Sequence, residues 1–177
     1  LDGVTQVAGP DFMRNFLAET INSRHYFFGS TIDTLDLLIS RLKSEIPGLN
    51  IIGSYSPPFG YVSEAKKVDI INTIKKNNPD YIWVGLGAPK QEYWMSENWE
   101  KLRPAILFGV GAAFDFHAGS KPRAPMWMQR IGLEWFHRLL SEPHRLWRRY
   151  LSTNSTFILY TVRVLVRKSK SCKVKAE

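Results

Sequence analysis

Residues 84–94, with the sequence VGLGAPKQEYW, hold the pattern that decides the fold. The stretch begins as the apolar end of a buried strand, turns at Gly85 and Gly87, and continues from Pro89 into a helix that starts with Lys, Gln and Glu. A strand–glycine–helix junction is where an α/β protein holds an anion or a nucleotide. The stretch therefore predicts a strand end with a ligand near Gln91.

The flanking sequence repeats this alternation of strand and helix. Strands are expected at 25–30, 49–55, 81–87 and within 104–116, with helices at 9–22, 31–48, 63–80 and from residue 89 onward. Short turns join these segments, which predicts a parallel sheet with helices on both faces, a Rossmann-like α/β fold. We expect the helices to bury one face each, listed here by their apolar positions: Leu35, Leu38, Ile39 and Leu42 in one, Val68, Ile71 and Ile74 in the next.

The carboxyl ends of parallel strands form the ligand edge of such a sheet. Gly29 ends one strand, and a second Gly-x-Gly turn at 109–111 precedes Asp115. Neither Gly-x-Gly turn, at 85–87 or at 109–111, completes a dinucleotide or P-loop fingerprint. Each is therefore also consistent with a simple tight turn between strand and helix. Asp115 is interpreted as a carboxylate that binds a base or a sugar, or as a helix cap. Gln91, with an amide that both donates and accepts, is interpreted as a ligand contact, or as a surface glutamine.

The positive charge is concentrated in the last third of the chain. Residues 121–177 hold thirteen Lys or Arg against three Glu, a net charge of +10, while the whole chain carries +8. This predicts two domains, an α/β core at 1–120 and a basic helical appendage at 121–177, the latter facing an anionic partner. Residues 124–151 are expected to be helical with breaks at Gly132 and Pro143. For 156–167 both helix and strand fit, and helix is favoured.

Several kinds of chemistry lack their sequence patterns. The longest apolar run, 156–166, is far shorter than the ~20 residues of a membrane span, and the single Cys172 leaves no internal disulfide. His spacing does not suggest a metal site, and no Asp-x-Asp is present to hold a magnesium–diphosphate. Cationic side chains would then neutralise a diphosphate. Arg138, Arg145 and Arg148 could do so, or they could form a solvated helix face.

Three stretches resemble one family. The sequences GLGAPKQEYW (85–94), VAGPDFM (7–13) and the long run from Gly109 to Leu151 are similar to the WecG/TagA/CpsF family of bacterial glycosyltransferases. The resemblance covers about Val7 to Leu151 and preserves the order and spacing of the motifs. It implies an inverting, metal-independent transferase without a cofactor, which moves N-acetylmannosamine or a related sugar from a UDP donor to a sugar on undecaprenyl diphosphate, in cell-surface polysaccharide or teichoic acid linkage synthesis.

The resemblance also implies roles for residues at matching positions. Gln91, Arg145 and Arg148 would act in catalysis, with the arginines stabilising the departing UDP. The UDP-sugar would be bound by Gly29, Tyr61, Gly85, Gly87, Gln91, Asp115 and Arg138, with Tyr61 stacking on uracil. Family members carry a further N-terminal segment with an Asp-Gly motif, whose Asp is the favoured general base. Asp2-Gly3 lies too close to Gly9 to be that motif, so the chain is expected to lack that segment and the base. Gln6 stands where the family usually has Arg, which removes a cation.

The expected partners follow from the charge distribution and from the family resemblance. They are a UDP-sugar donor, a polyprenyl-diphosphate-linked sugar acceptor and an anionic membrane surface bound by 121–177, and a homo-oligomer stays open. No metal and no nucleic acid are expected, and the resemblance implies a peripheral location on the cytoplasmic face of the bacterial plasma membrane. Two alternatives use the same residues. A nucleic-acid-binding module would use the +10 region with its tryptophans, and a non-catalytic fragment or scaffold would lack the base.

Overall fold

The computed structural model describes residues 7–58, 60, 62–144, 146–147, 156–157, 160–161 and 163–164. The chain forms two compact units, Leu1–Pro122 and Arg123–Glu177. The predicted fold class is confirmed, since the described residues of the first unit form an all-parallel sheet covered by helices.

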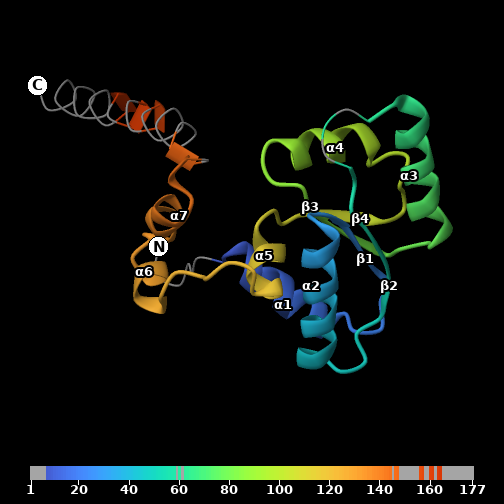
Figure 1. The fold of residues 1–177 in the computed structure, drawn as a ribbon, viewed down its shortest axis with the longest axis horizontal. Coiled ribbons are helices and arrows are strands. Elements are labelled where there is room, and N and C mark those ends of the chain that lie inside the picture. Colours follow the sequence, from blue (N-terminus) through green and yellow to red (C-terminus); the bar gives the residue numbers. More distant parts are fainter. Residues whose placement is uncertain are drawn as a thin grey trace, which may run out of the picture. The chain divides into compact units, whose positions relative to one another are not determined.

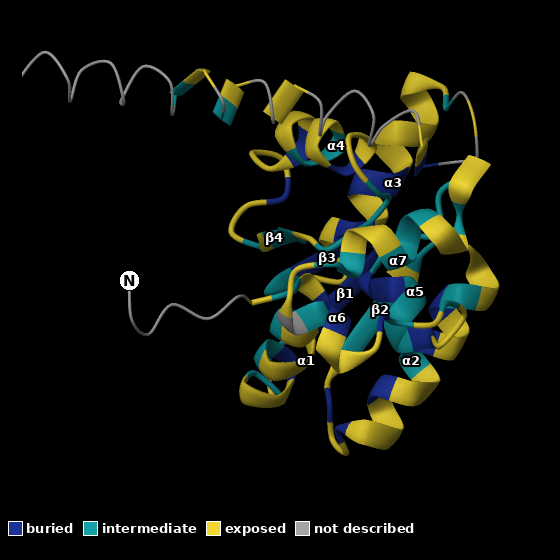
Figure 2. Ribbon diagram, turned by 90° about the vertical axis from the view of Figure 1, so that its left-hand side faces the viewer, coloured by how far each residue is buried: buried dark blue, intermediate teal, exposed yellow. Residues whose placement is uncertain are grey.

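The sheet has the strand order β2-β1-β3-β4, with β1 (His25–Gly29) and β3 (Tyr81–Gly85) in the middle and β2 (Ile51–Tyr55) and β4 (Ile106–Gly109) at the edges. Tyr26 pairs with Ile82 and Gly29 with Gly85, so the two central strands end together. Apart from His25, their buried side chains are apolar or aromatic on both faces, as is typical of strands that are covered on both sides. In Figure 2 these strands are the buried centre of the unit.

Five helices cover the sheet in the described part of this unit. α1 (Gly9–Glu19), α2 (Ile32–Glu45) and α5 (Ala113–Ala118) lie on one side, and α3 (Glu64–Lys76) and α4 (Lys90–Asn98) lie on the other (Figure 1). The first group, with Phe114 of α5, packs on Phe27 and Trp83, and the second packs on Phe28, Ile82 and Val84. The hydroxyls of Thr31 and Ser63 cap the first turns of α2 and α3, a role for which Ser and Thr are suited.

Two details differ from the expectations. Val68 is 57% exposed, because the buried face of α3 is formed by Ile70, Ile71 and Ile74. The strand expected within 104–116 is β4, and it is followed by the short helix α5, which was not expected from the sequence. Asp115 lies in the first turn of this helix.

The edge of the sheet opposite the strand carboxyl ends is held by polar contacts. The Arg24 guanidinium donates to both Asp80 oxygens, at 3.1 and 2.7 Å, and the hydrogen bonds from Arg24 lower the pKa of Asp80 to about 2. Beside it the buried His25 accepts at Nδ1 from the Trp83 indole at 3.2 Å, which leaves Nε2 to donate to the Thr20 carbonyl at 2.9 Å. Burial lowers the pKa of His25, which favours the neutral imidazole that accepts from Trp83.

The second unit is helical where it is described. α6 (Met126–Arg130) and α7 (Glu134–Ser141) are separated by Gly132, which has a φ of 74°. The predicted break at Gly132 is confirmed. In the tail, residues 156–157, 160–161 and 163–164 are helical, and the Thr161 hydroxyl donates to the Phe157 carbonyl one turn earlier. For these residues the helix alternative is confirmed.

Candidate functional site

The candidate site is built at the carboxyl ends of β1 and β3, where two glycines touch. A methyl group on Gly29 would lie 2.6 Å from the carbonyl carbon of Gly85, and one on Gly85 would overlap the Phe114 ring. Gly29 also has a φ of 122°, a conformation that side chains rarely adopt. These two glycines are therefore required by the packing of the sheet, whether or not they also contact a ligand.

Ser30, the next residue, has a φ of 58°, which is unusual for a residue with a side chain. Its amide donates to the Gly85 carbonyl at 3.1 Å, and its own carbonyl accepts from the Ser56 hydroxyl at 2.7 Å. The backbone is thus held at the mouth of the site by contacts with two other strand ends. Such strained positions cluster at functional sites, and sequence reasoning did not single out Ser30.

Gln91 lies in the first turn of α4, directly above the β3 glycine turn. The backbone N–H of Gln91 donates to the Gly87 carbonyl at 3.1 Å, the hydrogen bond that starts the helix. The residue is only 8% exposed. The side-chain Nε2 donates to Glu92 Oε1 at 2.9 Å. Gln91 Oε1 is buried and has no hydrogen-bond partner among the described residues. A buried acceptor left in this state costs about 1–3 kcal/mol, so it calls for a physical reason.

The second glycine turn encloses the same side chain. A methyl group on Gly109 would lie 3.1 Å from Gln91 Nε2, and one on Gly111 would lie 3.3 Å from Gln91 Oε1 and 3.8 Å from the Gly87 Cα. A methyl group on Gly87 would meet nothing within 4 Å. The structure therefore brings Gly87, Gln91 and the 109–111 turn together, with open space on the outer side of Gly87.

Asp115 belongs to the same edge through its neighbour Phe114, the ring that covers Gly85. Its carboxylate pairs with Lys121 at 2.8 Å and its side chain is 21% exposed. The Asp115 carbonyl accepts from the amides of Ser120 and Lys121, at 3.0 and 3.4 Å, which fixes the segment after α5. The carboxylate is accessible and held in place, as a ligand contact requires.

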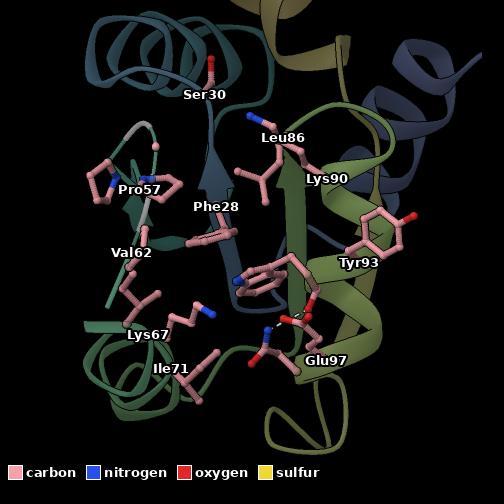
Figure 3. Close-up of a pocket in the computed structure, with 16 residues that line it drawn as sticks. Phe28, Ser30, Pro57, Val62, Lys67, Ile71, Leu86, Lys90, Tyr93 and Glu97 are labelled. Atoms are coloured by element: carbon pink, nitrogen blue, oxygen red, sulfur yellow. Dashed lines mark hydrogen bonds between the residues drawn. The ribbon is translucent and has the colours of Figure 1, made fainter. Parts of the chain in front are cut away.

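A cavity of ≈ 380 Å³ opens beside Gly85, between the ends of β1 and β3, the loop before α3, and helices α3 and α4 (Figure 3). Its floor is aromatic, since the Phe28 and Trp94 rings stack with centroids 4.1 Å apart. Lys67 and Lys90 line it on opposite sides, and Figure 3 shows Phe28 and Lys67 directed into it. A space of this size, lined by an aromatic floor, two lysines and Glu97, suits a planar ring joined to a charged group.

Sequence reasoning missed most of this cavity. Its wall from α4 consists of Lys90, Tyr93, Trp94, Glu97 and Asn98, positions that recur every three or four residues. That spacing was visible in the sequence as a helix face. The pairing of this face with α3 was not, because it depends on two helices on the same side of the sheet.

The remaining predicted site residues fall elsewhere. Tyr61, Arg145 and Arg148 lie outside the described residues, so their predicted roles stay predictions. Arg138 lies on α7, in the second unit, and is partly buried. In the same unit α6, its C-cap Ile131 and α7 expose large apolar side chains, among them Trp127, Ile131 and Leu140.

Neither a metal site nor a membrane span has a candidate among the described residues. No group of three or more His, Cys, Asp or Glu is placed to hold a metal ion in that part of the chain. None of the helices described is both long and apolar enough to cross a membrane.

Comparison with known proteins gives consistent relatives. The chain is 37% identical over 151 residues to an N-acetylglucosaminyldiphosphoundecaprenol N-acetyl-beta-D-mannosaminyltransferase of Bacillus subtilis (strain 168). The matched stretch covers 84% of this chain and 56% of the relative. Proteins of the same name from Bacillus spizizenii and Staphylococcus aureus (strain MW2) are 35% and 28% identical, over 84% and 89% of this chain and 56% and 59% of theirs. The chain thus spans somewhat over half the length of these relatives. Residues 2–171 match the family described as Glycosyl transferase WecG/TagA/CpsF, and the chain belongs to that family.

Proposed function

We propose that this chain supplies the sugar-nucleotide-binding part of a glycosyltransferase that moves N-acetylmannosamine from a UDP donor to N-acetylglucosamine on undecaprenyl diphosphate. The observation that carries the proposal is the convergence of Gly87, Gln91 and the 109–111 turn beside an aromatic, lysine-rimmed cavity, in a chain of this family. The relatives' names describe that acceptor and that sugar.

The chemistry proposed is a single displacement. A hydroxyl of the acceptor sugar attacks the anomeric carbon of the donor, a carboxylate takes the hydroxyl proton as general base, and UDP leaves. Charge that develops on the diphosphate is neutralised by cationic side chains, so we propose that the reaction needs no metal. Lys67 and Lys90 at the cavity rim, and the arginines predicted from the sequence, would supply that positive charge.

The second unit is proposed to bind the membrane surface that carries the acceptor lipid, on the cytoplasmic face. Exposed aromatic and aliphatic side chains on α6 and α7, in a segment with a net charge of +10, are typical of a peripheral membrane contact. Co-sedimentation with vesicles tests this. Binding should rise with phosphatidylglycerol content and fall with salt, and binding that ignores both would contradict the assignment.

Calorimetric titration with UDP tests the proposed function of the first unit. Folded protein should bind UDP, and Lys90→Met should weaken binding about tenfold through loss of one charge-assisted contact. Lys66→Met removes the same charge from an exposed position of α3 outside the cavity and should leave the affinity unchanged. Folded protein that gives no heat at millimolar UDP would refute the proposal, and salt-dependent RNA binding in its place would favour the nucleic-acid alternative.

A further inference from the structure

The Gln91–Glu92 pair at the start of α4 fixes more than a helix turn. Glu92 is exposed, yet its Oε1 accepts a hydrogen bond from the buried Gln91 Nε2 at 2.9 Å. A carboxylate can only accept, so the nitrogen of the Gln91 amide must face Glu92 and the oxygen must face away. The orientation of this amide therefore follows from its neighbour.

The Gln91 oxygen that faces away meets the two glycine turns. The oxygen lies against Gly111, where an added methyl group would be 3.3 Å from it. An added methyl group on Gly87 would meet nothing within 4 Å, so open space lies beside Gly87. Among the described residues the Gln91 oxygen has no hydrogen-bond partner, although the side chain is more than nine-tenths buried. An acceptor held in this way requires a partner that donates a hydrogen bond.

The need for a hydrogen-bond donor at Gln91 Oε1 distinguishes between the groups of a sugar nucleotide. An ionised diphosphate has only acceptor oxygens, so it cannot satisfy Gln91 Oε1. A sugar hydroxyl or an acetamido N–H can. Basic side chains suit the diphosphate, and this amide oxygen suits the sugar.

We propose that Glu92 is a positioning residue, which holds the Gln91 amide so that its oxygen accepts a hydrogen bond from a hydroxyl or an acetamido N–H of the bound sugar nucleotide. The inference rests on the proposed function for the identity of the ligand. The oxygen is enclosed by the 109–111 turn, so access of a ligand to the oxygen requires this turn to shift. Gly111, with a φ of 50° and no side chain, is the residue next to the oxygen at that point.

The orientation can be tested without a ligand by the side-chain amide signals of Gln91 in a ¹⁵N-labelled sample. The proton donated to Glu92 should be shifted downfield and slow to exchange. Glu92→Leu should move it to the position of a free glutamine amide, and Glu92→Gln should restore part of the shift. Glu100→Leu, which removes an exposed carboxylate from the turn after α4, is the matched control and should change nothing. A Gln91 signal that Glu92→Leu leaves in place would overturn the positioning role.

The ligand contact is tested by calorimetry with UDP and with UDP-N-acetylmannosamine. Gln91→Leu and Glu92→Leu should each weaken binding about fivefold, and the double variant should bind no more weakly than Gln91→Leu alone, because the two act on one contact. A loss seen only with UDP-N-acetylmannosamine assigns the donor group to the transferred sugar, and a loss seen with both nucleotides assigns it to the uridine part. Additive losses in the double variant would overturn the proposal.

A swap of the two residues, Gln91→Glu with Glu92→Gln, decides between a hydroxyl and a phosphate as the partner. It keeps the net charge, the hydrogen bond within the pair and an acceptor at position 91, so sugar-nucleotide binding should stay within about threefold of the wild type. If Gln91 instead donated to phosphate, the swap would place a carboxylate against the diphosphate and binding would be lost, which would overturn the inference. No binding of either nucleotide by the folded wild type would refute the proposed function instead, and the amide signals would still decide the role of Glu92. Circular dichroism melts confirm that each variant is folded.

Discussion

Replacing Gly29 with alanine should destabilise the first unit more than any other glycine substitution of similar backbone geometry. The new methyl group would lie 2.6 Å from the carbonyl carbon, 2.8 Å from the oxygen and 3.0 Å from the nitrogen of Gly85. These are backbone atoms of the paired central strand, so no side chain can rotate out of the way. The φ of 122° adds backbone strain.

The magnitude follows from these two terms. A residue with a side chain in a sparsely populated backbone region costs about 1–3 kcal/mol, and overpacking of a fixed core costs about 1–3 kcal/mol more. Together they give about 4 kcal/mol, a large part of the ~5–15 kcal/mol that stabilises a typical domain. At about 4 °C per kcal/mol for a unit of this size, the melting midpoint should fall by about 15 °C.

Gly48→Ala is the matched control. Gly48 also has a positive φ, 86°, but its added methyl group would meet only the Ile21 side chain at 3.6 Å, an ordinary contact. It should cost the strain alone, about 1–3 kcal/mol, or a fall of about 8 °C in the melting midpoint. Thermal melts followed by circular dichroism compare the two variants. Equal shifts would refute the reasoning that the β1–β3 backbone approach requires glycine.

Three further predictions concern charge and pH. The pKa of Asp80 in the folded protein, about 2, is below its ordinary value of 3.8. Its pairing with Arg24 should therefore stabilise the fold above about pH 4, and this contribution should be lost as the pH falls toward about 2. Urea unfolding should show Asp80→Asn less stable than the wild type at pH 7 but not at pH 2. Burial lowers the pKa of His25 below 6.5, so unfolding releases a site that takes up a proton and wild-type stability should fall as the pH drops below about 6.5. His25→Gln should flatten this slope in urea titrations from pH 5 to 8, and an unchanged slope would contradict the assignment. Asp115→Asn should weaken UDP binding about tenfold by calorimetry, whereas Asp36→Asn, an exposed carboxylate of α2, should not; equal effects would point to general charge and not to a contact.

The local pattern of the first unit could be predicted because it depends on short-range chemistry. The strands at Tyr26–Phe28 and Ile82–Val84 are apolar runs that end in glycine, and Thr31 and Ser63 cap the helices that follow strands or loops. Boundaries were less certain, and α5 was missed. A helix of six residues, entered from a glycine turn and ended by Gly119 at a φ of 66°, has too few turns to show a period.

The site could be predicted only in part. The glycine turns and Gln91 were predicted from the sequence, but it did not show that a methyl group on Gly111 would reach Gln91 Oε1, since that proximity joins two crossovers of the sheet. The cavity between α3 and α4 and the strained Ser30 were missed for the same reason. Their residues lie far apart in the chain and have no shared local signal.

The sequence by itself determined the alternation of strands and helices, the glycine turns that end the strands and the separation of charge between the two parts of the chain. Periodicity, capping and composition are local properties, and neighbouring residues suffice to specify them. The tertiary structure decided which turns meet, that Gln91 is buried with its oxygen held toward Gly111, and that Phe28 and Trp94 stack as the floor of a cavity. These features depend on strand order and on which face each helix covers, and only the packing of the whole unit sets those.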